Sequence, residues 1–302
     1  MELIKPQKLH KGDTIGFIAP CYMIQKEEAE KSRSVLEGLG YRVKYAKNLF
    51  SSEWGFAGSD LQRADDFNEM ILDEDVKMIL FTGGEVSIHL LPLLNYEQIR
   101  KHVKIICSYS DSTTLLSAVY SRSKIVTFYG QSIHTFVEAE QYNIDSFMQR
   151  LQAGTLEYVS ATPWRKIHGG TAQGELIGGY LGNYALIQNT KYYSLEKNKK
   201  YLLFLEDHEK FIEPAAVSRY LTALEQDGIF DLTSGLIFGH YSKHPRPLIK
   251  EILERIGNKY NIPVVWTEDF GHGNYNAIFP IGTRAELNAD TGIFRFLESG
   301  IV

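Results

Sequence analysis

The chain has 302 residues, of which 44% are hydrophobic, and its formal net charge at pH 7 is -5. This length and composition predict a globular protein with a large core and favour two domains over one. The mild charge, without a basic stripe or polybasic segment, excludes a typical nucleic-acid-binding protein and gives no sign of a membrane surface as partner. The first residues lack the apolar core of a signal peptide and no apolar run is long enough to span a membrane, so we expect a cytoplasmic protein. Cys21 and Cys107 adjoin strand-like segments, which argues against a disulfide framework.

The first half of the chain alternates strand and helix signals in the order typical of a parallel sheet. The predicted strands are short apolar runs, and the predicted helices carry apolar residues at near-helical spacing. In chain order we expect a strand at 14–20, a helix at 27–40, a strand at 41–46, a helix at 59–73, a strand at 76–81, a strand at 102–109, a helix from about 111 and a strand at 124–130. These repeats predict a doubly wound, Rossmann-like or flavodoxin-like α/β domain, whose ligands bind beyond the carboxyl ends of the strands.

The alternation of strand and helix signals is interrupted between residues 152 and 170, and a second set of elements follows. We therefore expect an N-terminal α/β domain at 1–150, a connection at 151–172 and a β-rich α/β domain at 173–302. The elements predicted in the second domain are strands at 173–179, 199–207, 234–240 and 262–266, helices at 215–228 and 247–257, and a β-hairpin at 285–296. A cleft between the two domains is the natural place for a ligand.

The stretch KIICSYSDSTTLL, Lys104 to Leu116, passes from a buried strand to a hydroxyl-rich turn and then to an amphipathic helix. Two interpretations fit this pattern. Ser110 or Asp111 is a helix cap that accepts a hydrogen bond from a backbone N–H group. Alternatively, Ser110 is a nucleophile held on a tight turn, beside N–H groups that can stabilise an oxyanion.

A nucleophilic serine needs a base, and the base needs an acceptor that orients it. His272 follows a predicted strand and lies between two glycines that leave its imidazole accessible, although a solvated loop histidine would look the same. Glu206 ends the apolar run YLLFL, where an ordinary exposed acid is also common. Together, three strand ends supply a hydroxyl, a carboxylate and an imidazole in the chain order Ser, Glu, His.

A fourth strand end carries Gly83 and Gly84, which follow Thr82 after the strand at 76–81. The bare backbone N–H groups of this pair could form an oxyanion hole together with the N–H of Asp111. A structural role is equally open, because a turn from strand to helix often needs a positive φ.

Two other signals are weaker. His240 and His244 are four residues apart, as two metal ligands on a helix would be, but Pro245 makes a helix there improbable and we expect no metal site. The segment GGYLGN at 178–183 lacks the full GxGxxG spacing of a dinucleotide-binding loop, so we do not expect a dinucleotide-binding fold.

Several motifs, in chain order, resemble the LD-carboxypeptidases of cell-wall recycling and the related microcin C self-immunity peptidases. They are KGDTIGFIAP, GSDLQRADDFNEMILDEDVKMIL, SYSDSTTLL, LLFLED, IPVVWTEDFGHG and FPIGTRAEL, and they cover nearly the whole chain. The resemblance implies a two-domain fold and a catalytic triad of Ser110, Glu206 and His272. It also implies oxyanion donors in the backbone of Gly84 and Asp111, no metal or organic cofactor, and a homodimer.

The sequence departs from the family pattern at three places. Where carboxypeptidases usually have RGGYG, this chain has TGGEVS, so Thr82 replaces the arginine and Glu85 adds an acid. Ser108 replaces the glycine two residues before the nucleophile, and Tyr180 replaces the asparagine of a GGNL motif, for which Asn183 is a possible substitute. These changes affect the identity of the substrate, and the candidate substrate contacts are Gly83, Glu85, Tyr109 and Tyr180.

The family resemblance implies hydrolysis of the L,D amide bond to the terminal D-alanine of a murein tetrapeptide. An immunity-type amidase, which cleaves an aminoacyl or peptidyl group from a nucleotide-like conjugate, is the nearest alternative. A non-catalytic binding protein with the same fold is a second. An α/β-hydrolase esterase shares the Ser, Glu, His order but is disfavoured, because Ser108 and Ser112 stand where its GxSxG motif has glycines.

Overall fold

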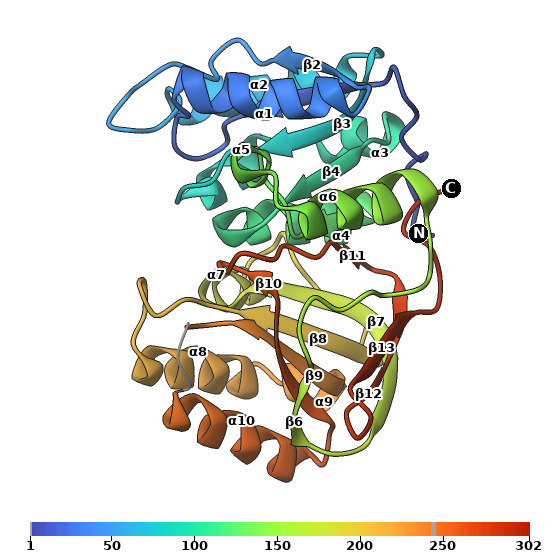
Figure 1. Cartoon of the computed structure of the whole chain (residues 1–302). Coiled ribbons are helices and arrows are strands. Elements are labelled where there is room, and N and C mark those ends of the chain that lie inside the picture. Colours follow the sequence, from blue (N-terminus) through green and yellow to red (C-terminus); the bar gives the residue numbers. More distant parts are fainter. Residues whose placement is uncertain (1, 243–245) are drawn as a thin grey trace.

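The computed structural model describes residues 2–242 and 246–302. These residues form two lobes, each built on one β-sheet, which lie one above the other in Figure 1. The two ends of the chain lie close together: the backbone N–H of Val302 donates to the carbonyl of Pro6 at 2.9 Å. An α/β first lobe and a sheet-rich second lobe confirm the predicted fold class.

The first sheet has the strand order of a doubly wound fold. Its strands are β1 (Thr14–Ile18), β2 (Arg42–Tyr45), β3 (Val76–Phe81), β4 (Ile105–Ser108), β5 (Thr127–Tyr129) and β11 (Phe279–Ile281). They are arranged as β11-β5-β4-β3-β1-β2, with β11 antiparallel to β5 and the other pairs parallel. Without β11 this is the flavodoxin-like order, so the carboxyl ends of β1, β3 and β4 meet at one edge.

Helices cover both faces of the first sheet. They are α1 (Lys26–Gly38), α2 (Asp60–Leu72), α3 (Tyr96–Lys101), α4 (Thr113–Ser123), α5 (Thr135–Glu138) and α6 (Gln141–Phe147), with the short helices η1 (Ser87–Leu93), η2 (Ser110–Ser112) and η3 (Met148–Ala153). In β3, Ile79 and Phe81 pack with Phe67 of α2, whereas Met78 and Leu80 belong to the opposite cluster. Because successive side chains of a strand point to opposite faces, the continuous apolar run VKMILF is typical of a strand covered on both sides.

The second sheet is mixed and has the order β13-β12-β7-β8-β9-β10-β6. Its strands are β6 (Arg165–His168), β7 (Thr171–Tyr180), β8 (Tyr201–Glu206), β9 (Thr233–His240), β10 (Val264–Gly271), β12 (Arg284–Asn288) and β13 (Ile293–Phe296). The helices of this lobe are α7 (Leu181–Gln188), α8 (Pro214–Gln226), α9 (Ile229–Leu232) and α10 (Pro247–Tyr260), and Figure 1 shows α8 and α10 together on one side of the sheet. Strands β7 to β10 run parallel, so their carboxyl ends also share one edge. Within the described part of the chain, no helix is both long and apolar enough to cross a membrane.

Two short strands lie outside the segments where the sequence suggested them. β6 falls within the expected connection at 151–172, yet it pairs with β10 at the edge of the second sheet. β11 comes from the C-terminal half but completes the first sheet, where Phe279 lies opposite Tyr129. Both strands have only three or four residues, and β6 is partly exposed, so neither carries a pattern long enough to predict.

Candidate active site

Ser110 lies on the turn between β4 and α4. Its φ is +61°, in the left-handed region that costs energy for a residue with a side chain and is typical of strained nucleophile turns. Its backbone N–H donates to the hydroxyl of Tyr129 at 3.2 Å, and its carbonyl accepts from Oγ1 of Thr113 at 2.7 Å. Hydrogen bonds on both sides of Ser110 therefore hold the strained turn in place.

The three candidate relay residues, which are far apart in the sequence, lie within hydrogen-bond distance in the structure. His272 Nε2 is 2.8 Å from Ser110 Oγ, and His272 Nδ1 is 2.9 Å from Glu206 Oε2. Glu206 is the last residue of β8 and His272 follows β10, so two strands of the second sheet bring them to the candidate nucleophile of the first lobe. Because Nδ1 donates to the carboxylate, Nε2 is free to accept the hydroxyl proton of Ser110.

The capping interpretation applies to Asp111, but for a different helix. Its carboxylate accepts from the backbone N–H groups of Val86 at 3.1 Å and Ser87 at 2.7 Å, at the start of η1. The hydroxyl of Ser110 instead bonds to His272. Asp111 therefore ties the loop that contains Gly84 to the turn that contains Ser110.

Glycine is required at two positions around this arrangement. Gly84 has a φ of +134°, and a Cβ there would lie 2.5 Å from the backbone nitrogen of Tyr22. Gly271 has a φ of +104°, and a Cβ there would lie 2.8 Å from Oε2 of Glu206. The first glycine lets the candidate oxyanion loop turn beside the nucleophile, and the second leaves room for the carboxylate against the backbone that precedes His272.

Burial and charge act in opposite directions on the pKa of His272. Burial lowers its pKa, whereas the charge of Glu206 and the hydrogen bond to that carboxylate raise it, and the net result is a raised pKa. A raised pKa makes the neutral imidazole a stronger base. Asp207 is completely buried, and its burial together with the charge of Glu206 raises the pKa of Asp207 to about 7.

The candidate substrate contacts do not all lie equally close to the imidazole. The rings of Tyr109 and Tyr180 flank His272, with centroid distances of 5.2 Å and 5.0 Å. Gly83 donates its N–H to Nδ1 of His134, in the loop between β5 and α5, at 3.4 Å. The carboxylate of Glu85 accepts from the hydroxyl of Tyr22 at 3.2 Å, and Glu85 is exposed. Of the four candidate contacts, Tyr109 and Tyr180 are therefore those with a ring contact to the imidazole.

Three further residues lie at the site, of which the sequence had suggested only Asn183, as a possible substitute for the motif asparagine. Tyr129 donates its hydroxyl to Glu206 Oε1 at 2.5 Å. Asn183 donates its side-chain amide to Oδ1 of Asp111 at 2.6 Å, so an asparagine does reach the nucleophile turn although Tyr180 replaces the one in the motif. Lys210 lines a cleft of about 650 Å³ beside His272. The only signal for Lys210 in the sequence is its position, four residues after Glu206.

The same cleft contains His240, whose Nδ1 contacts the carboxylate of Glu268. Its suggested metal-binding partner, His244, lies outside the described residues. The two cysteines are poor nucleophile candidates, because both are buried and burial raises the pKa of the Cys107 thiol to about 12 and that of Cys21 well above its usual value.

Family models match two parts of the chain. The LD-carboxypeptidase N-terminal domain matches residues 15–130, and the LD-carboxypeptidase C-terminal domain matches residues 173–287. The nucleophile turn falls in the first match, and Glu206 and His272 fall in the second.

Individual relatives carry two kinds of name. A probable murein peptide carboxypeptidase from Bacillus subtilis (strain 168) is 31% identical over 94% of this chain and 91% of its own length. The microcin C7 self-immunity protein MccF from Escherichia coli is 27% identical over 92% of this chain and 91% of its own length. A solved structure of MccF in complex with aspartyl sulfamoyl adenosine, at 25% identity, covers 99% of this chain and 100% of that one with a TM-score of 0.89.

Proposed function

Because the chain belongs to the LD-carboxypeptidase family, we propose that it is a serine peptidase that releases the terminal D-alanine of a murein tetrapeptide. The observation that carries the proposal is the continuous relay from Ser110 Oγ to His272 at 2.8 Å and from His272 to Glu206 at 2.9 Å. A nucleophile, a base and an orienting acid in this order are what acyl transfer through a serine ester requires.

In the first half of the reaction, His272 Nε2 accepts the proton of Ser110 as Oγ attacks the carbonyl carbon of the scissile amide. The developing oxyanion accepts hydrogen bonds from the backbone N–H groups of Gly84 and Asp111, each of which supplies about 3 kcal/mol of transition-state stabilisation. The imidazolium then gives its proton to the leaving amine, and the C–N bond breaks. Glu206 remains ionised and stabilises the imidazolium throughout.

In the second half, a water molecule takes the place of the leaving amine. His272 accepts a proton from this water as the oxygen attacks the ester carbonyl, and it returns the proton to Ser110 Oγ when the ester bond breaks. The products are D-alanine and a peptide shortened by one residue. No step requires a group other than the substrate, water and the residues named.

The charges of the cleft support removal of a C-terminal residue. A carboxypeptidase must bind the free carboxylate next to the scissile bond, and a cation is the usual partner for a carboxylate. Lys210 and Arg165 both line the cleft of about 650 Å³ that contains His272. Two carboxylates line it as well, Glu209 and Glu268, which pair with Arg246 and His240. We assign this cleft to the leaving D-alanine, with its carboxylate toward Lys210.

The immunity-type amidase is the second candidate, and the loop before η1 favours it. Thr82 occupies the place of the family arginine; it is fully buried and its hydroxyl donates to the carbonyl of Tyr22 at 2.9 Å. A buried threonine supplies no positive charge there, and MccF, whose solved complex contains aspartyl sulfamoyl adenosine, matches this chain over nearly its whole length. In this alternative the same relay cleaves the amide between an aminoacyl group and a nucleoside sulfamate.

A paired assay separates the candidates. The purified protein and its Ser110→Ala variant are incubated with murein tetrapeptide and, separately, with aspartyl sulfamoyl adenosine, and kcat/KM is measured for each. We expect D-alanine release that depends on Ser110, with the larger kcat/KM for the tetrapeptide. A larger value for the nucleoside conjugate would favour the amidase, and binding of either compound without turnover would favour a non-catalytic protein.

We also propose two folding units, at residues 1–150 and 173–302, and a cytoplasmic location, both from the sequence pattern, and a homodimer, which the family resemblance implies. Sedimentation equilibrium of the purified protein tests the dimer, because a single species of 34.4 kDa would contradict it.

Limited proteolysis tests the boundaries between the two proposed folding units. Cleavage confined to residues 151–172 is expected for a connection between two units.

A further inference from the structure

Tyr129 lies between the nucleophile turn and the acid of the relay. Its side chain is completely buried, and its hydroxyl accepts from the backbone N–H of Ser110 at 3.2 Å while it donates to Oε1 of Glu206 at 2.5 Å. The other carboxylate oxygen, Oε2, faces Nδ1 of His272 at 2.9 Å. Each oxygen of this buried carboxylate therefore has its own donor.

These bonds close a ring that begins and ends at one residue. From the N–H of Ser110 the path runs through Tyr129, Glu206 and His272 and returns at 2.8 Å to the Oγ of Ser110. The ring joins both lobes, since Ser110 and Tyr129 belong to the first sheet region and the other two follow or end strands of the second. A shift of either lobe would lengthen at least one bond of this ring.

We propose that Tyr129 is a positioning residue of the hydrolytic site, whose hydroxyl fixes the strained turn of Ser110 and the carboxylate of Glu206 relative to each other. The inference rests on the proposed serine hydrolysis. Tyr129 itself is held firmly, because it ends β5 opposite Ser108 of the nucleophile strand and its ring packs against Phe204 with centroids 5.5 Å apart. A rigid phenol can therefore set the geometry of more mobile groups.

The hydroxyl also lowers the affinity of the relay for a proton. Burial, followed by the charge of Glu206, raises the pKa of Tyr129 well above its usual value, so the phenol remains a neutral donor. Its hydrogen bond stabilises the carboxylate most when His272 is neutral, because the carboxylate then has no cation beside it. Without the bond, the Glu206–His272 pair binds its proton at a higher pH, whichever of the two residues carries it.

Other titratable groups face this pair and remain the same when only the hydroxyl of Tyr129 is removed. They are Asp207 beside Glu206, Tyr109 and Tyr180 on either side of the imidazole, and His208, which packs against His272 and has His240 behind it. A change in the titration of His272 after loss of one hydroxyl is therefore assignable to that hydroxyl.

The test compares Tyr129→Phe with the matched control Tyr120→Phe. Tyr120 is also buried and also donates its hydroxyl to a glutamate, Glu175, but at the far end of α4. For both variants the ring C–H signals of His272 are titrated by NMR, and kcat and KM are measured against pH. We expect Tyr129→Phe to raise the apparent pKa of His272 by roughly half a unit or more and to lower kcat about tenfold, with KM within about twofold. The control variant should change neither the apparent pKa of His272 nor kcat.

A second variant keeps the test decisive if Tyr129→Phe fails to fold. Tyr129→3-fluorotyrosine, introduced at this position alone, has nearly the same shape and a more acidic phenol, so it donates more strongly and should move the titration of His272 to lower pH. A folded variant of either kind with the titration and kcat of the wild type would overturn the inference. Absence of Ser110-dependent turnover in the wild type would instead contradict the proposed function, and the NMR titration would still decide the role of Tyr129.

Discussion

Two tyrosine–glutamate pairs join the lobes at opposite ends of α4, and only one of them belongs to the candidate active site. Tyr129 donates to Glu206 near the start of the helix, and Tyr120 donates to Glu175 near its end. In each pair the tyrosine belongs to the first lobe and the glutamate to a strand of the second sheet. The difference between the pairs lies in what faces the second carboxylate oxygen.

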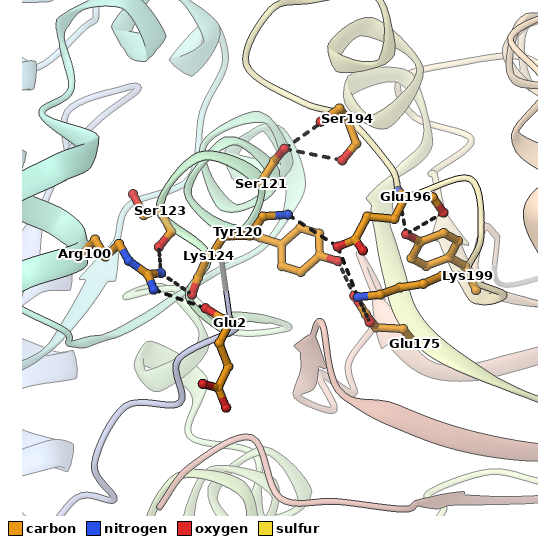
Figure 2. A network of polar contacts seen from close by, with 11 residues as sticks. Glu2, Arg100, Tyr120, Ser121, Ser123, Lys124, Glu175, Ser194, Glu196 and Lys199 are labelled. Carbon is orange, nitrogen blue, oxygen red and sulfur yellow. Dashed lines mark hydrogen bonds and ion pairs between the residues drawn. The ribbon is translucent and has the colours of Figure 1, made fainter.

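At the end of α4, the second oxygen of Glu175 faces a permanent cation. Lys199 Nζ lies 3.0 Å from Glu175 Oε2 and 3.2 Å from Glu196, which in turn lies 3.7 Å from Lys124 (Figure 2). Burial lowers the pKa of Lys199, but its hydrogen bonds to Glu175 and Glu196 raise it by more, so this ammonium stays charged near neutral pH. Several members of the network are partly exposed. This junction can stabilise the contact between the lobes, but it has no proton to transfer near neutral pH.

At the start of α4, the second oxygen of Glu206 faces His272 at 2.9 Å, and an imidazole gains and loses its proton near neutral pH. The carboxylate is completely buried, so its charge acts on the imidazole with little screening by water. The same bonded pair therefore has a structural place beside a lysine, whereas beside a histidine it belongs to the proposed proton relay. The following predictions test this contrast, from the largest expected effect to the smallest.

The largest effect is expected from loss of the nucleophile. Ser110→Ala should lower kcat on the order of 10⁵-fold or more, because the other relay groups then have no oxygen to activate. The matched control at the other junction is Ser121→Ala, since Ser121 Oγ accepts from the backbone N–H of Ser194 at 3.0 Å (Figure 2). The rate of D-alanine release is measured for both variants. Substantial activity of a folded Ser110→Ala protein would rule out acyl transfer through this residue.

The next effect contrasts the two glutamates directly. Glu206→Gln should lower kcat by about 10⁴-fold, because an amide does not hold His272 in the tautomer that leaves Nε2 free to accept a proton. Glu175→Gln should leave kcat/KM within about twofold, since among the described residues its side chain bonds to Lys199 and Tyr120 and not to the candidate relay. Steady-state kinetics of both variants provide the measurement, and equal losses of activity would mean that the two junctions are not functionally distinct.

The parts of this site that lie at strand ends could be predicted from the sequence, because strand ends are visible as the limits of apolar runs. Ser110, Glu206 and His272 each follow or end such a run, and parallel strands bring their carboxyl ends to one edge. Tyr129 also ends a strand, but an aromatic residue there is typical of a core position, and nothing local indicates that its hydroxyl reaches Glu206. That contact depends on how two sheets meet, which no single segment encodes.

The fold shows the same division between local and non-local information. Alternating strand and helix signals predict the doubly wound lobe, since each unit carries its own apolar pattern. Strand β11 has three residues and joins the first sheet only because the C-terminal half of the chain returns to it, with Phe279 opposite Tyr129. Similarly, the contact between Asn183 and Asp111 joins residues 72 positions apart. Contacts of this kind become visible only when the lobes are placed together.

A smaller effect concerns the pH dependence of the wild type. Burial lowers the pKa of His272, but the charge of Glu206, the hydrogen bond to its carboxylate and the charge of Asp207 together raise it by more, so the imidazole is protonated at a higher pH than an ordinary histidine. Activity should therefore fall, as the pH is lowered, through an apparent pKa above about 6.5. The profile of kcat/KM against pH is the measurement, with Glu175→Gln as the control that should not move it. An acid limb below this value would indicate that burial dominates instead.

The smallest effect is expected at the junction that Figure 2 shows. Tyr120→Phe removes one buried hydrogen bond to Glu175, and we expect the free energy of unfolding to fall by about 1 kcal/mol. A loss of this size lowers the melting temperature of a chain this long by about 2 °C, measurable by calorimetry. The carboxylate keeps its ion pair with Lys199, so kcat/KM and its pH profile should stay within error of the wild type. A shifted pH profile would show that the two ends of α4 are coupled, and the contrast between a structural and a functional tyrosine–glutamate pair would then fail.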